Sequence, residues 1–212
     1  MDLNKYIDHT LLAAKASKKE IIKLCEVAIA HNFFAVCVNS SRVALAYESL
    51  KGHEIYIAAT IGFPLGSAST SAKVEEANRA VTDGATELDM VMNIGDLKDG
   101  NHENILKEIK LIKNTVPEGI LKVIIETCYL SNSEIETASK LVAQAGADYV
   151  KTSTGFGSRG ASFEDVKLMA AATEGKIKIK ASGGIRDKAT ALEYIRLGVS
   201  RIGTSSGIKI IS

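Results

Sequence analysis

The chain has few of the residues that mark disulfide-rich or metal-binding proteins. It holds only three cysteines, Cys25, Cys37 and Cys128, which are widely spaced and form no CxxC pair. That pattern argues against a disulfide framework and a structural zinc site, and favours reduced thiols in the cytoplasm. The four histidines are scattered and show no ligand spacing such as HExxH. We therefore expect no bound metal.

The chain also lacks a strong charge of one sign and a long apolar run. Its formal net charge is +1 over 212 residues, so bulk electrostatics favours neither nucleic acid nor a membrane surface as a partner. No apolar run reaches transmembrane length, and the first residues lack the apolar core of a signal peptide. The hydrophobic share of 46% is that of an ordinary globular protein. We expect a cytoplasmic protein without nucleic-acid or membrane partners.

Strand-like runs alternate with helical patterns along the whole chain. The expected strands span residues 6–12, 33–38, 55–61, 87–92, 121–126, 148–151, 176–181 and 201–203. Such alternation predicts a parallel sheet. Eight βα units close a barrel, whereas the competing open doubly wound sheet usually has about five or six strands. We therefore predict an α/β protein, a (β/α)8 TIM barrel, in which residues 1–212 form a single domain.

The period-2 pattern of the strands turns several ionisable side chains toward the barrel interior. Leu88 and Met90 suit the helix-facing side, so Asp89 points inward; the same reasoning turns Lys151 and Lys180 inward. The two lysines lie 29 positions apart, and one βαβ step takes about 30 residues. They are therefore expected to be neighbours at the C-terminal ends of successive strands, where barrel active sites lie.

Two adjacent lysines with an aspartate are typical of amine chemistry. A neighbouring ammonium and partial burial lower a lysine pKa, which frees the amine to attack a carbonyl. The pattern predicts a Schiff base at one lysine, with Asp89 carrying protons. Such chemistry requires no cofactor. The alternative is a purely structural buried ion-pair network.

Glycines and serines after the last strands suggest an anion site. Gly155, Gly183, Gly184, Ser205 and Ser206 follow the three final strands. In barrels, the loops after strands seven and eight often bind phosphate through backbone N–H groups. The alternative is that these glycines merely end strands. Together they predict a phosphate-binding site.

The segment from Gly155 to Gly160 also matches GxGxxG. A dinucleotide site needs an acidic residue at the end of the next strand, but Lys180 stands there. We therefore assign no NAD site. Asp8, Thr10, Cys37 and Thr152 are assigned to the substrate pocket, although Cys37 also fits a small buried thiol.

Eight motifs together resemble deoxyribose-phosphate aldolases, a class I aldolase family, over essentially the whole chain. They are IDHTLL (7–12), VCVN (36–39), IGFPLG (61–66), ELDMV (87–91), KVIIE (122–126), VKTSTG (150–155), KASGG (180–184) and RIGTSS (201–206). The resemblance implies reversible cleavage of 2-deoxy-D-ribose 5-phosphate to D-glyceraldehyde 3-phosphate and acetaldehyde, within deoxyribonucleotide catabolism. It implies Lys151 as the Schiff-base lysine, Asp89 as proton donor and acceptor, and Lys180 as the second catalytic lysine.

The resemblance also implies that Asp8 and Thr10 order the pocket, and that the protein forms a homo-oligomer, a dimer or a tetramer. Two positions depart from some relatives. Some relatives carry a basic residue directly after the TSTG loop, where this chain has Phe156. Some also carry a C-terminal tyrosine that enters the site, and this chain shows no such tyrosine. Two other functions remain open: a sugar-phosphate isomerase barrel without a covalent imine, and a non-catalytic phosphate-sensing barrel.

Overall fold

The strands and helices alternate regularly in the computed structural model, which describes residues 2–212. The strands are β1 (Ile7–Leu11), β2 (Ala35–Asn39), β3 (Tyr56–Ile61), β4 (Glu87–Val91), β5 (Ile120–Ile124), β6 (Tyr149–Lys151), β7 (Lys178–Ser182) and β8 (Arg201–Thr204). The helices are α1 (Lys18–Ala30), α2 (Val43–Leu50), α3 (Thr70–Thr82), α4 (Ile94–Lys98), α5 (His102–Lys113), α6 (Asn132–Gln144), α7 (Phe163–Thr173), α8 (Lys188–Arg196) and α9 (Gly207–Ile211).

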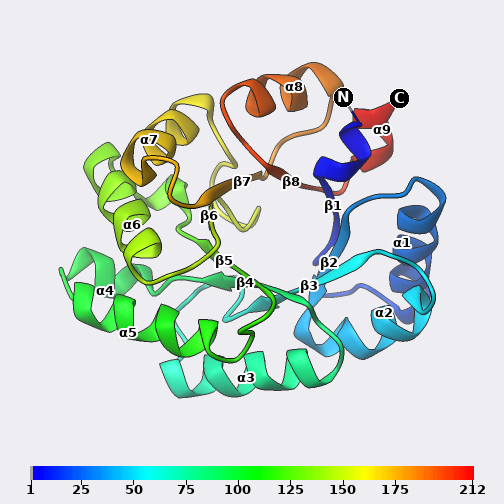
Figure 1. Ribbon diagram of the computed structural model, residues 1–212, viewed down its shortest axis with the longest axis horizontal. Coiled ribbons are helices and arrows are strands. Elements are labelled where there is room, and N and C mark those ends of the chain that lie inside the picture. The colour runs from blue at the N-terminus through cyan, green and yellow to red at the C-terminus, as the bar shows by residue number, and fades with distance from the viewer. Residues whose placement is uncertain (1) are drawn as a thin grey trace.

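The eight strands form a closed parallel barrel in chain order, and β1 pairs with β8 to complete it. The helices form a ring outside the strands (Figure 1). This confirms the predicted single-domain TIM barrel. Capping boxes begin three helices: Ser17 with Glu20, Ser131 with Glu134, and Ser162 with Asp165. In each, the serine hydroxyl accepts an N–H that the helix cannot pair itself.

The hydrophobic core lies between the strands and the helices. The helix-facing side chains of the strands, among them Leu88, Met90, Val150 and Ile179, belong to one buried apolar cluster. Burial of such a layer is the main favourable term in folding. The opposite faces of the same strands turn inward and carry charged groups, as the alternation predicts.

A few boundaries differ from those expected. The predicted fifth strand ran to Glu126, but β5 ends at Ile124, and Glu126 has a left-handed backbone with φ of 49°. Helix α4 was not predicted, because five residues are too few to show a helical period. The seventh strand begins at Lys178, two residues later than expected.

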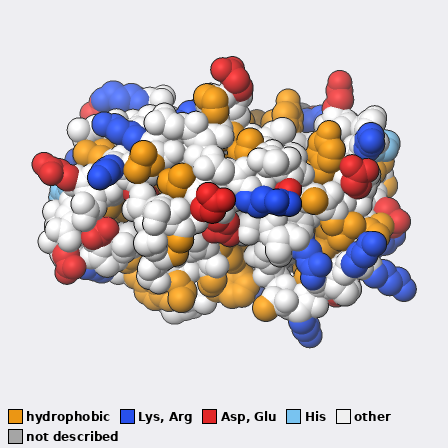
Figure 2. Space-filling view, turned by 90° about the horizontal axis from the view of Figure 1, so that it is seen from below, with side chains coloured by type: hydrophobic (Ala, Val, Ile, Leu, Met, Phe, Trp, Pro, Cys, Tyr) orange, Lys and Arg blue, Asp and Glu red, His pale blue; other side chains and the backbone are white. Residues whose placement is uncertain are grey.

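The surface shows no large region of one charge on the face drawn in Figure 2, where acidic and basic side chains are interspersed over most of the area. All three cysteines are free, as predicted. Across residues 2–212, no helix combines the length and apolar character needed to cross a membrane.

Candidate active site

Ionisable side chains from six neighbouring strands meet inside the barrel. They are Asp8 on β1, Glu87 and Asp89 on β4, Lys122 on β5, Lys151 on β6, Lys180 on β7 and Arg201 on β8. All are buried. We call this set the barrel network. The register pairs Lys151 with Lys180 and Lys180 with Arg201, which confirms that the two lysines are neighbours.

Asp89 is the centre of the network. Its Oδ2 accepts hydrogen bonds from Lys151 Nζ and from Lys180 Nζ, each at 2.7 Å. Its Oδ1 accepts one from Lys122 Nζ at 2.9 Å. One carboxylate oxygen therefore bridges the two lysines that the sequence singled out, and the other is held by a third lysine.

A second group of contacts surrounds Asp8. Its Oδ2 accepts a hydrogen bond from Lys180 Nζ, and its Oδ1 accepts one from Arg201 Nη1 at 2.7 Å. Glu87 accepts hydrogen bonds from Lys122 Nζ at 2.5 Å and from Arg201 Nη1 at 3.4 Å. Lys180 is thus held between two carboxylates, whereas Lys151 bonds only one.

This difference in partners separates the pKa values of the lysines. Burial lowers the pKa of Lys151, assisted by the nearby Lys180 ammonium, and the single carboxylate of Asp89 does not offset it. Burial acts on Lys180 as well, but Asp8 and Asp89 raise its pKa above the usual value. Although burial opposes ionisation of Asp89, the three lysines hold its pKa well below the usual range. Lys151 is therefore the amine most readily freed of its proton.

The charge count of the network agrees with this assignment. Four cations (Lys122, Lys151, Lys180 and Arg201) face three carboxylates (Asp8, Glu87 and Asp89), so the fully ionised network carries +1. A buried excess charge is costly. Loss of one proton from Lys151 makes the network neutral.

A glycine on the neighbouring strand makes room for Lys180. A Cβ added to Gly203 would lie 3.1 Å from Lys180 Cε and 3.0 Å from Ser182 Cβ. A larger residue at position 203 would therefore displace the Lys180 side chain and move its amine away from Asp8 and Asp89.

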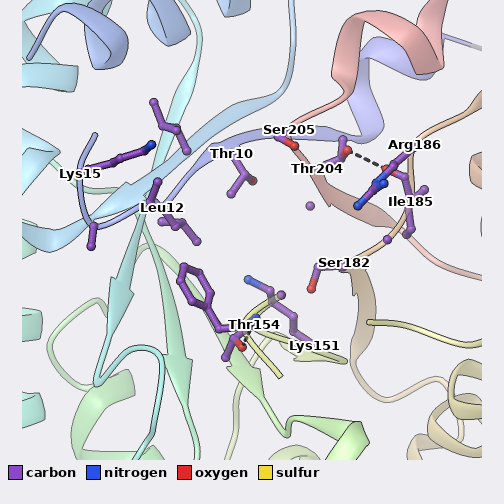
Figure 3. Close-up of a pocket in the computed structure, with 18 residues that line it drawn as sticks. Thr10, Leu12, Lys15, Lys151, Thr154, Ser182, Ile185, Arg186, Thr204 and Ser205 are labelled. Atoms are coloured by element: carbon purple, nitrogen blue, oxygen red, sulfur yellow. Dashed lines mark hydrogen bonds between the residues drawn. The ribbon is translucent and has the colours of Figure 1, made fainter. Parts of the chain in front are cut away.

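A cavity of about 720 Å³ opens at the C-terminal ends of the strands. Lys151 is the one member of the barrel network that lines it. Thr10, Ser182, Thr204 and Ser205 lie around the same opening, with Lys15 on one side and Arg186 on the other (Figure 3). A ligand in this cavity reaches the amine with the lowered pKa.

Backbone donors are exposed along one wall of the cavity. Gly155, Gly183 and Gly184 have φ values of 87°, 84° and 81°, a conformation that favours glycine. Within residues 2–212, the N–H groups of Gly183, Gly184 and Ser205 donate to no protein acceptor. The exposed guanidinium of Arg186 lies on the same wall. Free N–H groups beside a cation favour a bound anion.

Glu126 fixes the loop that follows Lys151. Its Oε1 and Oε2 accept the Thr154 N–H at 3.2 Å each, and Oε2 also accepts the Thr154 hydroxyl. Thr154 Oγ1 in turn accepts the Phe156 N–H at 3.0 Å. This buried carboxylate therefore positions the Gly155 turn at the cavity rim.

Four expected pocket or phosphate residues do not line the cavity. Asp8 lies one layer deeper than Thr10, and Cys37 is covered by a small apolar cluster with Leu12. Burial raises the Cys37 pKa to about 11. Both side chains lie beneath the cavity floor, where Asp8 holds Lys180 and Cys37 Sγ lies 3.9 Å from Asp89 Oδ2, and their assignment to the pocket stays a prediction.

Thr152 and Ser206 also lie outside the cavity lining, and their assignments stay predictions. Thr152 points away from the cavity because it alternates with Lys151, and its hydroxyl exchanges hydrogen bonds with the Ser182 backbone. The Ser206 N–H donates to Thr204 Oγ1 at 2.9 Å, so it is not free for an anion.

Sequence reasoning missed four residues that the structure brings to the site. Lys122, Glu87 and Arg201 belong to the barrel network, and Arg186 lines the cavity. Glu87 and Lys122 share the inward parity of Asp89 and Glu126, so the period-2 pattern already contained this signal. Arg186 lies in a loop, which has no such period.

Comparisons with known proteins identify relatives of the chain. Residues 3–211 match the family described as "DeoC/LacD family aldolase". The deoxyribose-phosphate aldolase of Treponema denticola is 50% identical and covers 100% of this chain and 99% of its own. The corresponding protein of Thermococcus gammatolerans is 51% identical over 100% of this chain and 96% of its own.

Solved structures give the same result. The aldolase QR15 superposes with a TM-score of 0.96 at 44% identity, covering 100% of this chain and 95% of its own. The deoxyribose phosphate aldolase of Aeropyrum pernix, described as tetrameric, gives 0.90 at 29% identity, covering 99% and 89%. The chain therefore belongs to the DeoC/LacD family of aldolases.

Proposed function

We propose that the protein is a class I aldolase that cleaves 2-deoxy-D-ribose 5-phosphate reversibly into D-glyceraldehyde 3-phosphate and acetaldehyde. The observation that carries the mechanism is the position of Lys151. It is the network residue that reaches the cavity, and its pKa is lowered. The sugar is chosen because the similar proteins are named deoxyribose-phosphate aldolases.

The chemistry begins with attack of the neutral Lys151 amine on the aldehyde carbon of the open-chain sugar. Loss of water gives a protonated imine. Removal of the proton from the C3 hydroxyl then breaks the C2–C3 bond, and its electron pair moves into the imine to form an enamine. Glyceraldehyde 3-phosphate leaves. Protonation of the enamine carbon and hydrolysis of the imine release acetaldehyde and return the amine.

Asp89 and Lys180 are proposed to handle the protons. Asp89 Oδ2 contacts both lysine amines at 2.7 Å, so a proton released at Lys151 can pass to the Asp89 carboxylate and from there to water. Because Asp89 favours its charged form, it also offsets the positive charge of the imine on the Lys151 nitrogen, whereas the Lys180 ammonium keeps the free Lys151 amine neutral.

Borohydride trapping tests the proposal directly. The protein is incubated with acetaldehyde, reduced, digested and mapped by mass spectrometry. We expect one ethyl group on Lys151, and less labelling when 2-deoxyribose 5-phosphate is present. An adduct on Lys180 would keep the aldolase and reverse the lysine roles. Folded protein without a selective adduct would favour an isomerase-type barrel, and turnover would exclude a phosphate-sensing role.

Arg186 is expected to bind the substrate phosphate, together with the N–H groups of Gly183, Gly184 and Ser205. Replacing Arg186 by alanine should raise KM for the phosphorylated sugar about tenfold, the size of one charge-assisted contact. Turnover should change little, because Arg186 does not contact the barrel network.

Two comparisons make this prediction specific. KM for unphosphorylated 2-deoxyribose should not change in Arg186→Ala. Arg196→Ala removes an exposed arginine that pairs with Glu193 on α8, and it should behave as the unmodified protein. Equal increases in KM for both sugars would show that Arg186 does not recognise the phosphate.

The proposed setting is the cytoplasm, where the three free cysteines would stay reduced. A homo-oligomer is also proposed, and the tetrameric description of the Aeropyrum pernix protein supports it. Size-exclusion chromatography with light scattering would give the number of chains.

A further inference from the structure

Arg201 is a buried cation that the proposed mechanism does not use. It is the first residue of β8, and it is 2% exposed. Its Nη1 donates to Asp8 Oδ1 at 2.7 Å and to Glu87 Oε2 at 3.4 Å. The centre of its guanidinium lies 3.5 Å from the centre of the Phe34 ring. Burying a cation is costly even when it is paired, so its place beside the reactive lysines calls for a role.

A chain of ion pairs connects Arg201 to Lys151. Asp8 accepts a hydrogen bond from Arg201 with one carboxylate oxygen and from Lys180 with the other. Asp89 Oδ2 then accepts hydrogen bonds from Lys180 Nζ and from Lys151 Nζ, each at 2.7 Å. Two carboxylates and one further lysine, all buried, therefore separate Arg201 from the amine that faces the cavity.

Titratable side chains on all eight strands lie around Lys151 and Arg201. Besides these two, they are Asp8 on β1, Cys37 on β2, Tyr56 on β3, Glu87 and Asp89 on β4, Lys122 on β5, Tyr149 on β6 and Lys180 on β7. Phenols and a buried thiol are uncharged near neutral pH. The charge inside the barrel is therefore that of the barrel network, four cations against three carboxylates.

Titratable groups beyond the strands add little to this balance. Lys15 and Arg186 line the cavity that Lys151 reaches, and Lys5, Tyr6 and Lys178 line a separate cavity beside Arg201. The four cations among them are exposed, so water and salt screen their charges. The buried Glu126 carboxylate is turned to the Thr154 loop. Without Arg201, three buried cations would balance three carboxylates, and the charge balance would no longer favour loss of a proton from Lys151.

The expected size of this effect follows from the strand register. Lys151 pairs with Lys180, and Lys180 pairs with Arg201. Neighbouring strands lie about 4.8 Å apart, which places the two charges about 10 Å from each other. At an effective dielectric constant of about 20, a unit charge at about 10 Å changes a pKa by about one unit. Removal of Arg201 should therefore produce a measurable shift in the titration of Lys151.

We propose that Arg201 is a positioning residue that acts on the reaction from a distance, because its charge favours the neutral form of the Lys151 amine. It does so by engaging Asp8 and Glu87, whose charges would otherwise stabilise the lysine ammonium groups. The inference rests on the proposed function, since the neutral amine matters as the nucleophile of an imine. The direction of the Lys151 pKa, below its usual value, agrees with it.

Two pH titrations of the full-length protein test the proposal. In the first, trace acetic anhydride labels the lysines over a series of pH values, and mass spectrometry gives the midpoint at which Lys151 is half neutral. In the second, kcat/KM for 2-deoxyribose 5-phosphate is measured over the same range. Arg201→Met should move both midpoints upward by about one pH unit. Arg201→Lys keeps the charge but loses the stacking on Phe34, so it should lower Tm and leave both midpoints in place.

Glu87→Gln provides a change of the opposite sign. It removes a carboxylate that contacts Lys122 and Arg201, so four cations face two carboxylates and both midpoints should move downward by about one pH unit. This variant also decides the question if Arg201→Met does not fold. Lys178→Met removes an exposed cation from β7, the strand beside β8, and should move neither midpoint because water screens that charge.

Several results would overturn the proposal. They are an unchanged labelling midpoint in folded Arg201→Met, an unchanged or upward midpoint in Glu87→Gln, and an Arg201→Lys midpoint that moves like that of Arg201→Met. Lower kcat/KM without a shift would show that Arg201 only supports the fold. The proposed function fails separately. If the labelling midpoints move as expected but the unmodified protein neither cleaves the sugar nor gives a borohydride adduct, Arg201 still sets the charge of Lys151 and the aldolase assignment is wrong.

Discussion

Replacing Lys151 by methionine is expected to abolish carbon–carbon bond cleavage, with a loss on the order of 10⁴-fold or more, because it removes the amine that is proposed to form the imine. The fold should survive. Methionine retains most of the buried stem, and removal of one cation leaves three cations facing three carboxylates in the barrel network. A coupled assay for glyceraldehyde 3-phosphate and a thermal melt measure the two effects.

A matched control and a pH profile sharpen this result. Lys167→Met changes an exposed lysine on α7 and should leave turnover unaltered. In the unmodified protein, kcat/KM should rise with pH as Lys151 loses its proton and should level off above its pKa. Since burial and Lys180 lower that pKa, the rise should end below the range of a free lysine. Substantial turnover by Lys151→Met would exclude the Schiff-base mechanism.

Replacing Asp89 by asparagine is expected to damage both stability and catalysis. The amide lacks the negative charge that faces Lys122, Lys151 and Lys180. Breaking such a buried pair costs about 3–5 kcal/mol, which lowers Tm by roughly 10 °C in a domain of this size. Loss of the proposed proton carrier should lower kcat by about 10²–10⁴-fold.

The surface ion pair between the exposed Arg79 and the half-buried Asp83 provides the comparison. Asp83→Asn removes the same charge at a solvent-facing pair with an N–O distance of 2.9 Å. Surface pairs contribute about 0–1 kcal/mol, so its Tm should shift by only a few degrees. If the two variants melted together, the barrel network would not stabilise the fold. Tm is measured by calorimetry, and kcat on folded protein well below it.

Alternation along the strands made much of this site predictable. Asp89, Lys151 and Lys180 were expected inside the barrel because apolar neighbours fix the opposite face of each strand, and the structure places them there. The same rule places Thr152 on the opposite face of its strand from Lys151, so the alternation does not support its assignment to the pocket. Lys122 and Glu87 also had inward parity, but both stood outside the expected cluster at the strand ends.

Other features could not be read from the sequence. Which carboxylate holds which lysine depends on the stagger between strands, which sets Asp8 opposite Gly203 and Lys180 opposite Arg201. Loop residues have no period, so the placement of Arg186 at the cavity and of Ser206 away from it required coordinates. The left-handed turn at Glu126 ended β5 early and redirected its carboxylate to Thr154.

The seam between β1 and β8 has a consequence for synthesis in the cell. Asp8 lies on the first strand, whereas its partners Lys180 and Arg201 lie on the last two. A growing chain on the ribosome therefore contains Lys151 before Lys180 and Arg201 have been synthesised and before the barrel can bury the amine. In such a chain the amine has the ordinary pKa of about 10.4 and stays protonated near neutral pH. On the proposed mechanism, the Lys151 amine therefore becomes reactive toward aldehydes only when the barrel closes.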